Sequence, residues 1–257
     1  MNQSRNIADA WERFGLRPLS ARSALASVLL GTDPPELPTG ALVRLCGRLG
    51  IAEGTTRVAL SRMVSAGELE ASAAGSGGFR LVGPELLARR ELQEQARRPL
   101  PGDWDGSWNL MVVAGSARPV AERNEVRRVL ADARLAEWRE GVWLRPANLP
   151  RPGAGVLTGA SYQWLQARPE DDPARLAGEL WPLVDWAARG RELLRIHAAG
   201  PDGDAVFTFA AAAALLRHLR ADPLLPSELL PAGWPGDELR RAYSVAVGGV
   251  TRLLRVS

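Results

Sequence analysis

The sequence contains no lysine, one cysteine, two histidines and no long apolar run. The single cysteine, Cys46, excludes an internal disulfide, and with only His197 and His218 beside it a Cys/His zinc site is hard to assemble. No segment approaches the roughly 20 apolar residues of a membrane span, and the first residues do not form a signal peptide. These absences predict a cytoplasmic protein that holds no metal ion and no cofactor and has no membrane partner.

All 32 basic residues are arginine. Residues 1–98 contain 13 arginines and 10 acidic residues, whereas the rest of the chain contains 19 of each. Guanidinium groups suit phosphate and guanine, but abundant alanine, glycine and proline indicate a GC-rich genome as one source of the arginine. Composition alone is therefore weak support for nucleic-acid binding. The length of 257 residues predicts two or three domains.

The order of elements expected in residues 20–82 is that of a winged helix. Ser20 is placed to cap a first helix, SARSALASVLL, which Gly31 ends before the loop TDPPELP. Thr39 is placed to cap a second helix, TGALVRLCGRLG. The apolar stripe of this second helix, which predicts its core-facing side, consists of Leu42, Leu45, Cys46 and Leu49.

A third helix and a hairpin follow this pair. Gly50 supplies a tight turn, Ile51 is a candidate core residue, and the third helix begins near Glu53. Residues 69–73 and 78–82 then alternate with the period of two short strands around a glycine-rich turn. The sequence therefore predicts a winged helix-turn-helix.

The third helix has two distinct sides on a helical wheel. Its core side is expected to contain Thr56, Ala59, Leu60, Met63 and Val64. The opposite side contains Gly54, Arg57, Val58, Ser61 and Ser65, with Thr55 and Arg62 on the flanks. A helix that enters the DNA major groove needs small residues, hydroxyl groups and a guanidinium for guanine or phosphate, and this side offers all three.

We take as candidate DNA-binding residues Thr39, Arg44, Gly54, Thr55, Thr56, Arg57, Ser61, Arg62 and Arg80. A second interpretation stays open for the first arginine of the third helix. Glu53 and Arg57 are four residues apart, a spacing at which they can form an ordinary surface ion pair on one helix face.

The remaining chain predicts two further domains. A strand from Trp108, a helix over 119–135 and strands near 135–138, 142–144 and 156–166 suggest a small ferredoxin-like domain. The predicted fold class is α+β, with an N-terminal winged helix-turn-helix, a central ferredoxin-like α+β domain and a C-terminal mainly helical domain. The predicted segments are an extension (1–19), the winged helix (20–83), a helical connector (84–103), the ferredoxin-like domain (104–170) and the helical domain (171–257).

Three residues of the central domain are candidate effector contacts. Trp138, Trp143 and Arg145 offer apolar surface and a positive charge for an acyl group or an anion. The alternative is that the tryptophans are core residues and that Arg145 holds a strand end in place. The alanine-rich helix FAAAAALLRHLR is a candidate dimer surface, because small residues permit close packing, and equally an internal helix.

Several segments carry a resemblance to a known family. LSARSALASVLLGTDPPELPTGALVRLCGRLGIAEGTTRVALSRMVSAGEL resembles the N-terminal domain of PaaX-type regulators, the phenylacetate-degradation repressor family. WDGSWNLMVV and EGVWLRPANLP resemble its middle segment, and ADPLLPSELLPAGWPG resembles its C-terminal segment. The resemblance spans nearly all of residues 17–257.

The resemblance implies a homodimeric repressor that binds double-stranded operator DNA in aromatic-catabolism operons. In this family an aryl-coenzyme A thioester, typically phenylacetyl-coenzyme A, releases the repressor from DNA. The DNA-binding residues of the family's winged helix correspond here to the helix that contains Arg57 and Arg62. One departure concerns the wing, which is often basic and aromatic in the family. Here the wing is ASAAGSGGFR, with Arg80 as its only charge.

Two alternative functions remain open. The family's central domain resembles small CRISPR-associated nucleases, which hold a metal with an acidic residue at the end of the first strand. Here that strand ends in Val113-Ala114-Gly115, so metal-dependent cleavage is disfavoured, and the sequence predicts no catalytic residues and no enzyme activity. The other alternative is an effector-binding or dimerisation protein that does not bind DNA.

Overall fold

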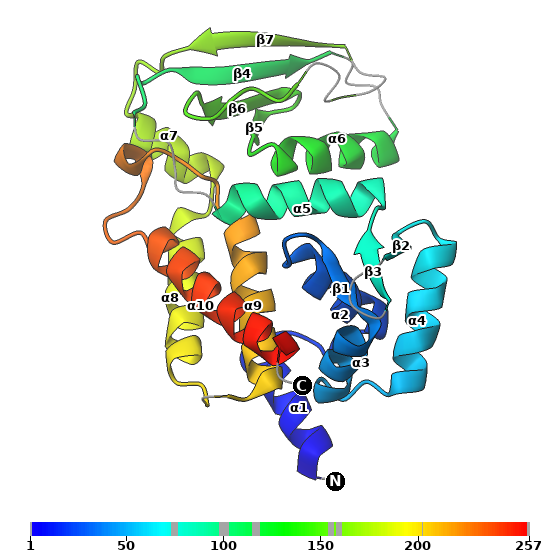
Figure 1. The fold of residues 1–257 in the computed structure, drawn as a ribbon. Coiled ribbons are helices and arrows are strands. Elements are labelled where there is room, and N and C mark those ends of the chain that lie inside the picture. The colour runs from blue at the N-terminus through cyan, green and yellow to red at the C-terminus, as the bar shows by residue number, and fades with distance from the viewer. Residues whose placement is uncertain are drawn as a thin grey trace. The chain divides into compact units, whose positions relative to one another are not determined.

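The computed structural model describes residues 2–72, 77–97, 103–114, 119–153, 157, 161–201 and 203–255. The chain forms two compact units, shown in Figure 1. The first unit contains residues 1–97, 189–221 and 235–257, and the second contains residues 98–188 and 222–234. The fold is mixed α+β, as predicted, and no helix of the described ranges is long and apolar enough to cross a membrane.

The first unit combines a small sheet with helices from both ends of the chain. Its elements are α1 (Asn2–Arg13), α2 (Ala21–Leu30), β1 (Glu36–Pro38), α3 (Thr39–Arg48), α4 (Glu53–Ser65), β2 (Leu69–Ser72), β3 (Gly78–Leu81), α5 (Pro84–Arg97), α9 (Ala205–Arg220) and α10 (Gly236–Arg255). Helix α8 (Leu183–Ala198) begins in the second unit and ends in the first. The three strands are antiparallel and lie in the order β1-β3-β2.

The beginnings of the first two predicted helices differ in how they are capped. The Ser20 hydroxyl accepts a hydrogen bond from the backbone nitrogen of Ser23 at 3.2 Å, which confirms the predicted cap of α2. The predicted cap at Thr39 is wrong, because Pro38 occupies the capping position and Thr39 is already helical. The Thr39 hydroxyl instead donates to the carbonyl oxygen of Gly77 at 3.2 Å. Thr39 thus connects the start of α3 to the start of β3.

The predicted loop TDPPELP contains a strand that the sequence did not indicate. Within it, β1 pairs with β3, with Glu36 opposite Arg80 and Leu37 opposite Phe79. Because β1 is an edge strand, Pro38 can end it without interrupting a ladder on its outer side. The predicted hairpin is present as β2 and β3, while residues 73–76 of its turn lie outside the described residues.

Helix α9 is the centre of the first unit. It packs against α1, α5 and α10, and α10 also contacts α3. The ring of Phe209 lies 6.2 Å from that of Trp11, and the ring of Phe207 lies 5.1 Å from that of Phe14. These contacts bury the alanine-rich side of α9, with Ala210, Ala211, Ala212 and Ala214 in the core. The structure therefore favours the internal-helix interpretation of FAAAAALLRHLR.

The second unit contains a four-stranded antiparallel sheet in the order β5-β6-β4-β7. Its elements are β4 (Trp108–Val113), α6 (Val120–Asp132), β5 (Ala136–Arg139), β6 (Val142–Pro146), β7 (Tyr162–Ala167), α7 (Pro173–Leu180), the start of α8, and the 3₁₀ turn η1 (Ser227–Leu229). The predicted helix and strands of this region are present with shifted ends. The helical segment predicted over 171–257 contributes to both units, because α9 and α10 bury their apolar sides in the first.

The sheet of the second unit is covered on both faces, because successive side chains of a strand point to opposite sides. Trp108 of β4 packs with Leu144 of β6 and Ala177 of α7. Met111 of β4 packs on the other side with Trp143 of β6 and Leu130 of α6.

Candidate nucleic-acid interface

The outer side of helix α4 is polar and small. Leu60 and Met63 are buried, as the wheel predicted, whereas Val64 is 40% exposed and does not belong to the core side on which it was expected. The exposed residues of α4 include Gly54, Thr55, Arg57, Val58, Ser61, Arg62 and Ser65. Two guanidinium groups, three hydroxyl groups and one glycine therefore share a continuous face without a bulky aromatic residue.

Thr56 is not part of this face. Its side chain is 0% exposed, and its hydroxyl donates to the carbonyl oxygen of Ala52 at 3.2 Å. Its side chain lies beside Cys46, whose pKa is raised because burial disfavours the thiolate. Cys46 is buried in α3, as predicted. Thr56 therefore joins α4 to α3 inside the core, and we remove it from the candidate DNA contacts.

The two arginines of α4 are in different electrostatic states. The Nε atom of Arg57 donates to a carboxylate oxygen of Glu53 at 2.8 Å, so the surface ion pair considered from the sequence is present. Within the described part of the chain, Arg62 has no ion-pair partner. The guanidinium of Arg62 is free to bind a phosphate or a base, whereas that of Arg57 must leave Glu53 or share it.

Helix α3 contributes one further exposed guanidinium. Arg44 lies on its solvent side and, over the described ranges, forms no ion pair. Gly40 lies close to it, because a Cβ atom at Gly40 would meet a terminal nitrogen of Arg44 at 3.3 Å. Of the two candidates on α3, Arg44 is exposed, whereas the Thr39 hydroxyl is bound to the carbonyl oxygen of Gly77 beside β3.

The hairpin formed by β2 and β3 offers no net positive charge. The Nε atom of Arg80 donates to a carboxylate oxygen of Glu70 at 2.8 Å, and a terminal nitrogen of the same guanidinium contacts that oxygen as well. Glu36 lies opposite Arg80 on the other side of β3. Its hydrogen bonds to Glu70 and the charges of both carboxylates raise the pKa of Arg80. Arg80, the predicted phosphate contact of the wing, is therefore already bound to Glu70 and lies opposite a second carboxylate.

The three predicted effector residues lie on two adjacent strands, but their environments differ. Arg145 is 4% exposed and donates to the carbonyl oxygens of Pro146 and Ala133 at 3.2 and 3.0 Å. Burial and the nearby charge of Arg134 lower the pKa of Arg145 to about 10. Trp143 is buried against α6. Both residues therefore form contacts inside the unit, and Arg145 connects the end of β6 to the end of α6.

Trp138 is the exposed member of the three. Its indole is 43% exposed, and the guanidinium carbon of Arg139 lies 5.1 Å from its ring centroid. With Trp143 and charged residues of α6 and β5 it lines an open groove of about 600 Å³. In the described residues, no group of three or more His, Cys, Asp or Glu side chains is placed to hold a metal ion.

The structure also contains a cavity that the sequence did not indicate. It lies within the first unit, has a volume of about 490 Å³ and is lined by α2, α5, α9 and α10 together with the chain beside α2. Arg89, Gln93 and Arg217 are among its polar lining residues. No local pattern marks this set, because its walls extend from Leu16 to Leu254 in the sequence.

Comparison with known proteins identifies the family. A family model described as PaaX-like protein matches residues 20–82, and one described as PaaX-like protein C-terminal domain matches residues 184–253. The solved structure of the uncharacterised protein Rv0674 from Mycobacterium tuberculosis is 42% identical, with a TM-score of 0.75, and the match covers 91% of this chain and 97% of that one. No curated protein matches the chain. The chain belongs to the PaaX-like family.

Proposed function

We propose that this protein is a sequence-specific DNA-binding transcriptional regulator. The observation that carries the proposal is the exposed face of α4, on which Arg57, Ser61 and Arg62 lie beside a glycine-containing first turn. In this proposal α2, α3 and α4 with β1–β3 form a winged helix-turn-helix, and α4 enters the major groove. Arg44 on α3 contacts the phosphate backbone beside it.

The remaining parts of the proposal follow the family. We propose a homodimeric repressor of an aromatic or acyl catabolic operon, such as phenylacetate catabolism, that an acyl-coenzyme A type effector releases from its operator. Membership in the PaaX-like family supports this. A two-fold operator would then have half-sites about one helical turn, or a multiple of it, apart.

We propose that the second unit contains a ferredoxin-like domain. Its support is the topology, since strand, helix, strand, strand and strand form an antiparallel sheet ordered β5-β6-β4-β7. Numbered along this domain, that order is 2-3-1-4, the order of a ferredoxin-like sheet. Strand β4 ends at Val113 without a carboxylate, which argues against the metal-dependent nuclease.

Recovery of genomic DNA fragments by the purified full-length protein tests the DNA-binding proposal. We expect the wild-type chain to enrich a small set of promoters, and R57A/R62A to enrich none of them. The matched control is R241A, which removes an exposed arginine of α10 outside the proposed interface. Failure of the wild-type protein to enrich any promoter would favour an effector-binding protein without DNA binding, and cleavage of fragments upon addition of Mg²⁺ or Mn²⁺ would favour the nuclease.

A further inference from the structure

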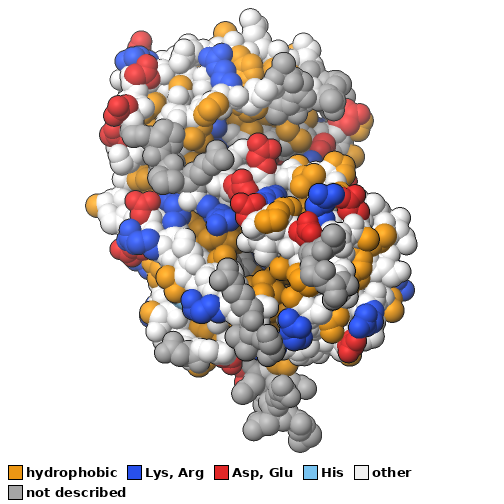
Figure 2. All heavy atoms as spheres, in the orientation of Figure 1, with side chains coloured by type: hydrophobic (Ala, Val, Ile, Leu, Met, Phe, Trp, Pro, Cys, Tyr) orange, Lys and Arg blue, Asp and Glu red, His pale blue; other side chains and the backbone are white. Residues whose placement is uncertain are grey.

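The cavity of the first unit has the dimensions of a small-molecule site. Its volume of about 490 Å³ lies within the roughly 300–1,000 Å³ that is typical of ligand pockets. Figure 2 shows hydrophobic side chains in a hollow on the face where α9 and α10 lie in Figure 1, with arginine side chains beside them. Apolar lining comes from Val28 of α2, Phe209 and Leu216 of α9, and Val250 and Leu254 of α10.

The charged residues of this cavity have one sign. Arg89 of α5 and Arg217 and Arg220 of α9 line it, and none of the lining residues is acidic. Arg89 and Arg217 form no ion pair with any residue that the structure describes. Partial burial of its guanidinium and the charges of Arg220 and Arg22 lower the pKa of Arg89. A bound anion would stabilise its charged form.

One buried polar side chain of the cavity lacks a partner. Gln93 is 5% exposed and lies one turn after Arg89 on α5. Among the described residues its amide forms no hydrogen bond, and it lines the cavity. An amide in this state on a cavity wall is suited to binding a polar atom of a ligand.

We infer that this cavity binds an organic anion with an apolar body, and that it is the effector site of the regulator. The apolar body lies among the aliphatic and aromatic side chains, the negative charge lies beside Arg89 and Arg217, and Gln93 hydrogen-bonds to a carbonyl or carboxylate oxygen. This inference rests on the proposed function and replaces Trp138, Trp143 and Arg145 as the effector contacts. Two sources supply this chemistry: a free carboxylate, or an acyl thioester of coenzyme A with its phosphates at the arginines.

The walls of the cavity connect it to the proposed DNA-binding elements. Val28 lies on α2, and α2 packs against α4. Helix α10 forms another wall and packs against α3. A ligand that changes the separation of these walls therefore acts on both helices that support the proposed reading face. By linkage, any change in DNA affinity caused by the ligand equals the change in ligand affinity caused by DNA.

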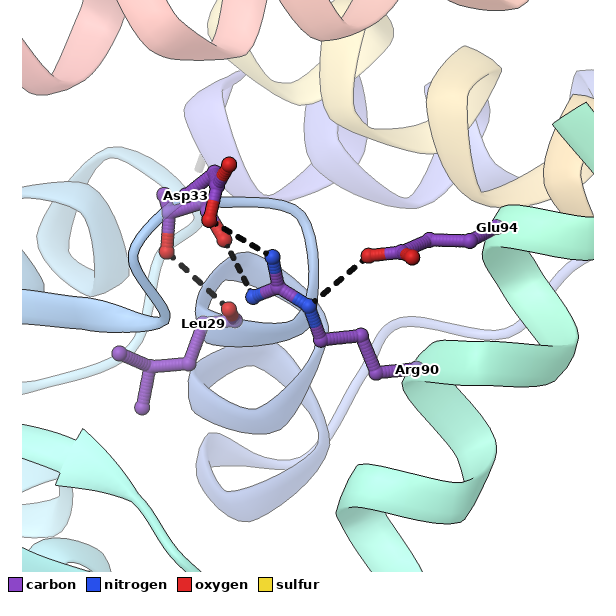
Figure 3. A network of polar contacts seen from close by, with 5 residues as sticks. Leu29, Asp33, Arg90 and Glu94 are labelled. Atoms are coloured by element: carbon purple, nitrogen blue, oxygen red, sulfur yellow. Dashed lines mark hydrogen bonds and ion pairs between the residues drawn. The ribbon is translucent and has the colours of Figure 1, made fainter.

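Arg90 of α5 is the centre of a network of polar contacts, shown in Figure 3. Its guanidinium donates to the carbonyl oxygen of Thr32 at 2.6 Å, contacts Asp33 at 3.1 Å and contacts Glu94 at 3.0 Å. The Thr32 hydroxyl in turn donates to the carbonyl oxygen of Leu29 at 3.0 Å. Thr32 also lines the cavity. This network joins α5 to the end of α2 and so transmits a displacement of α5 to the DNA-binding elements.

Titration calorimetry on the full-length protein without DNA tests the site. The probes are phenylacetate, octanoate, phenylacetyl-coenzyme A and coenzyme A alone. We expect a carboxylate or the thioester to bind to the wild-type protein, and R217Q to weaken that binding by about tenfold or more, since a hydrogen bond to a charged group contributes at least that factor. A213W, which fills the cavity from α9, should abolish binding. R241Q on α10 lies outside the lining and should bind like wild type.

The outcomes separate this inference from the proposed function. Unchanged binding by folded R217Q and A213W would overturn the site, as would the absence of binding by every probe. Binding of coenzyme A alone as tightly as its thioester would overturn the role of the apolar wall. Calorimetry involves no DNA, so a protein that binds a probe but enriches no promoter would leave the site standing and remove the regulator. Promoter enrichment by a protein that binds no probe would overturn the ligand site and leave the proposed regulator function in place.

Discussion

Helix α4 and the hairpin of β2 and β3 are neighbours in the chain, but their charges are arranged differently. On α4, Arg62 is exposed and has no ion-pair partner among the residues that the structure describes. On the hairpin, Arg80 is bound to Glu70 and faces Glu36 across β3. Both regions contain arginine on a solvent-exposed surface. Only the helix presents a guanidinium that a phosphate or guanine can bind without first displacing a carboxylate.

The comparison shows that a count of basic residues does not measure the charge available to DNA. Residues 1–98 contain 13 arginines, and some of them are neutralised in pairs such as Arg22 with Glu68 and Arg80 with Glu70. In the proposed function, recognition depends on α4, and the wing acts mainly as a scaffold.

The largest effect is expected on α4. R62A and R57A should each cost about 1–3 kcal/mol of binding free energy at a specific operator if the arginine contacts a base edge. Arg62 is expected to cost the more, because Arg57 must give up part of its interaction with Glu53 in order to bind. Mobility-shift titrations at fixed salt measure both variants. Equal operator affinity for wild type and both variants would exclude α4 as the reading helix.

A smaller effect is expected at Thr56, and on stability rather than on DNA binding. T56V keeps the volume of the buried side chain but removes its hydrogen bond to the carbonyl oxygen of Ala52. We expect a loss of about 1 kcal/mol in the free energy of unfolding, which lowers the melting temperature by a few degrees. Denaturant unfolding and a salt series of mobility shifts measure the two properties. Normal stability with weakened DNA binding would return Thr56 to the interface.

A gain in DNA affinity is expected when Arg80 loses its ion pair with Glu70. E70Q frees Arg80 for a phosphate and should strengthen binding to all sequences by about two- to fivefold, the scale of an exposed charge interaction. The salt dependence of binding should steepen by about one counterion. The matched control is E91Q, which removes one negative charge from α5 at a position away from the hairpin. An equal gain in both variants would show a general charge effect instead.

Local patterns in the sequence predicted much of this arrangement. The spacing of Leu60 and Met63 identified the buried side of α4, and the cap at Ser20 marked the start of α2. The mixed α+β class also followed from the spacing of apolar residues, which changes between helical and strand periods along the chain. These features depend on residues a few positions apart, and the physical rules for them act within one helix turn or one strand.

Features that depend on distant residues were missed or misassigned. The strand β1 looked like a proline-rich loop, because its partner β3 lies about 40 residues later. Arg80 looked available because its neutralisation depends on the strand register that places Glu70 opposite it. Arg145 looked like an anion contact until its burial and its bonds to Pro146 and Ala133 were known. The cavity of the first unit has walls from four helices, which no local pattern brings together.

The smallest effect is expected from Arg80 itself. In the wild-type protein R80A removes a guanidinium that Glu70 already neutralises, so operator affinity should change by less than about twofold, as for most exposed ion pairs. In the E70Q background the same change should cancel the gain of that variant and restore the wild-type salt dependence. A double-mutant cycle with these two changes isolates the coupling between the residues. If R80A alone weakened binding as strongly as R62A, the wing would be a full partner of α4 in recognition, and the division between reading helix and scaffold would be wrong.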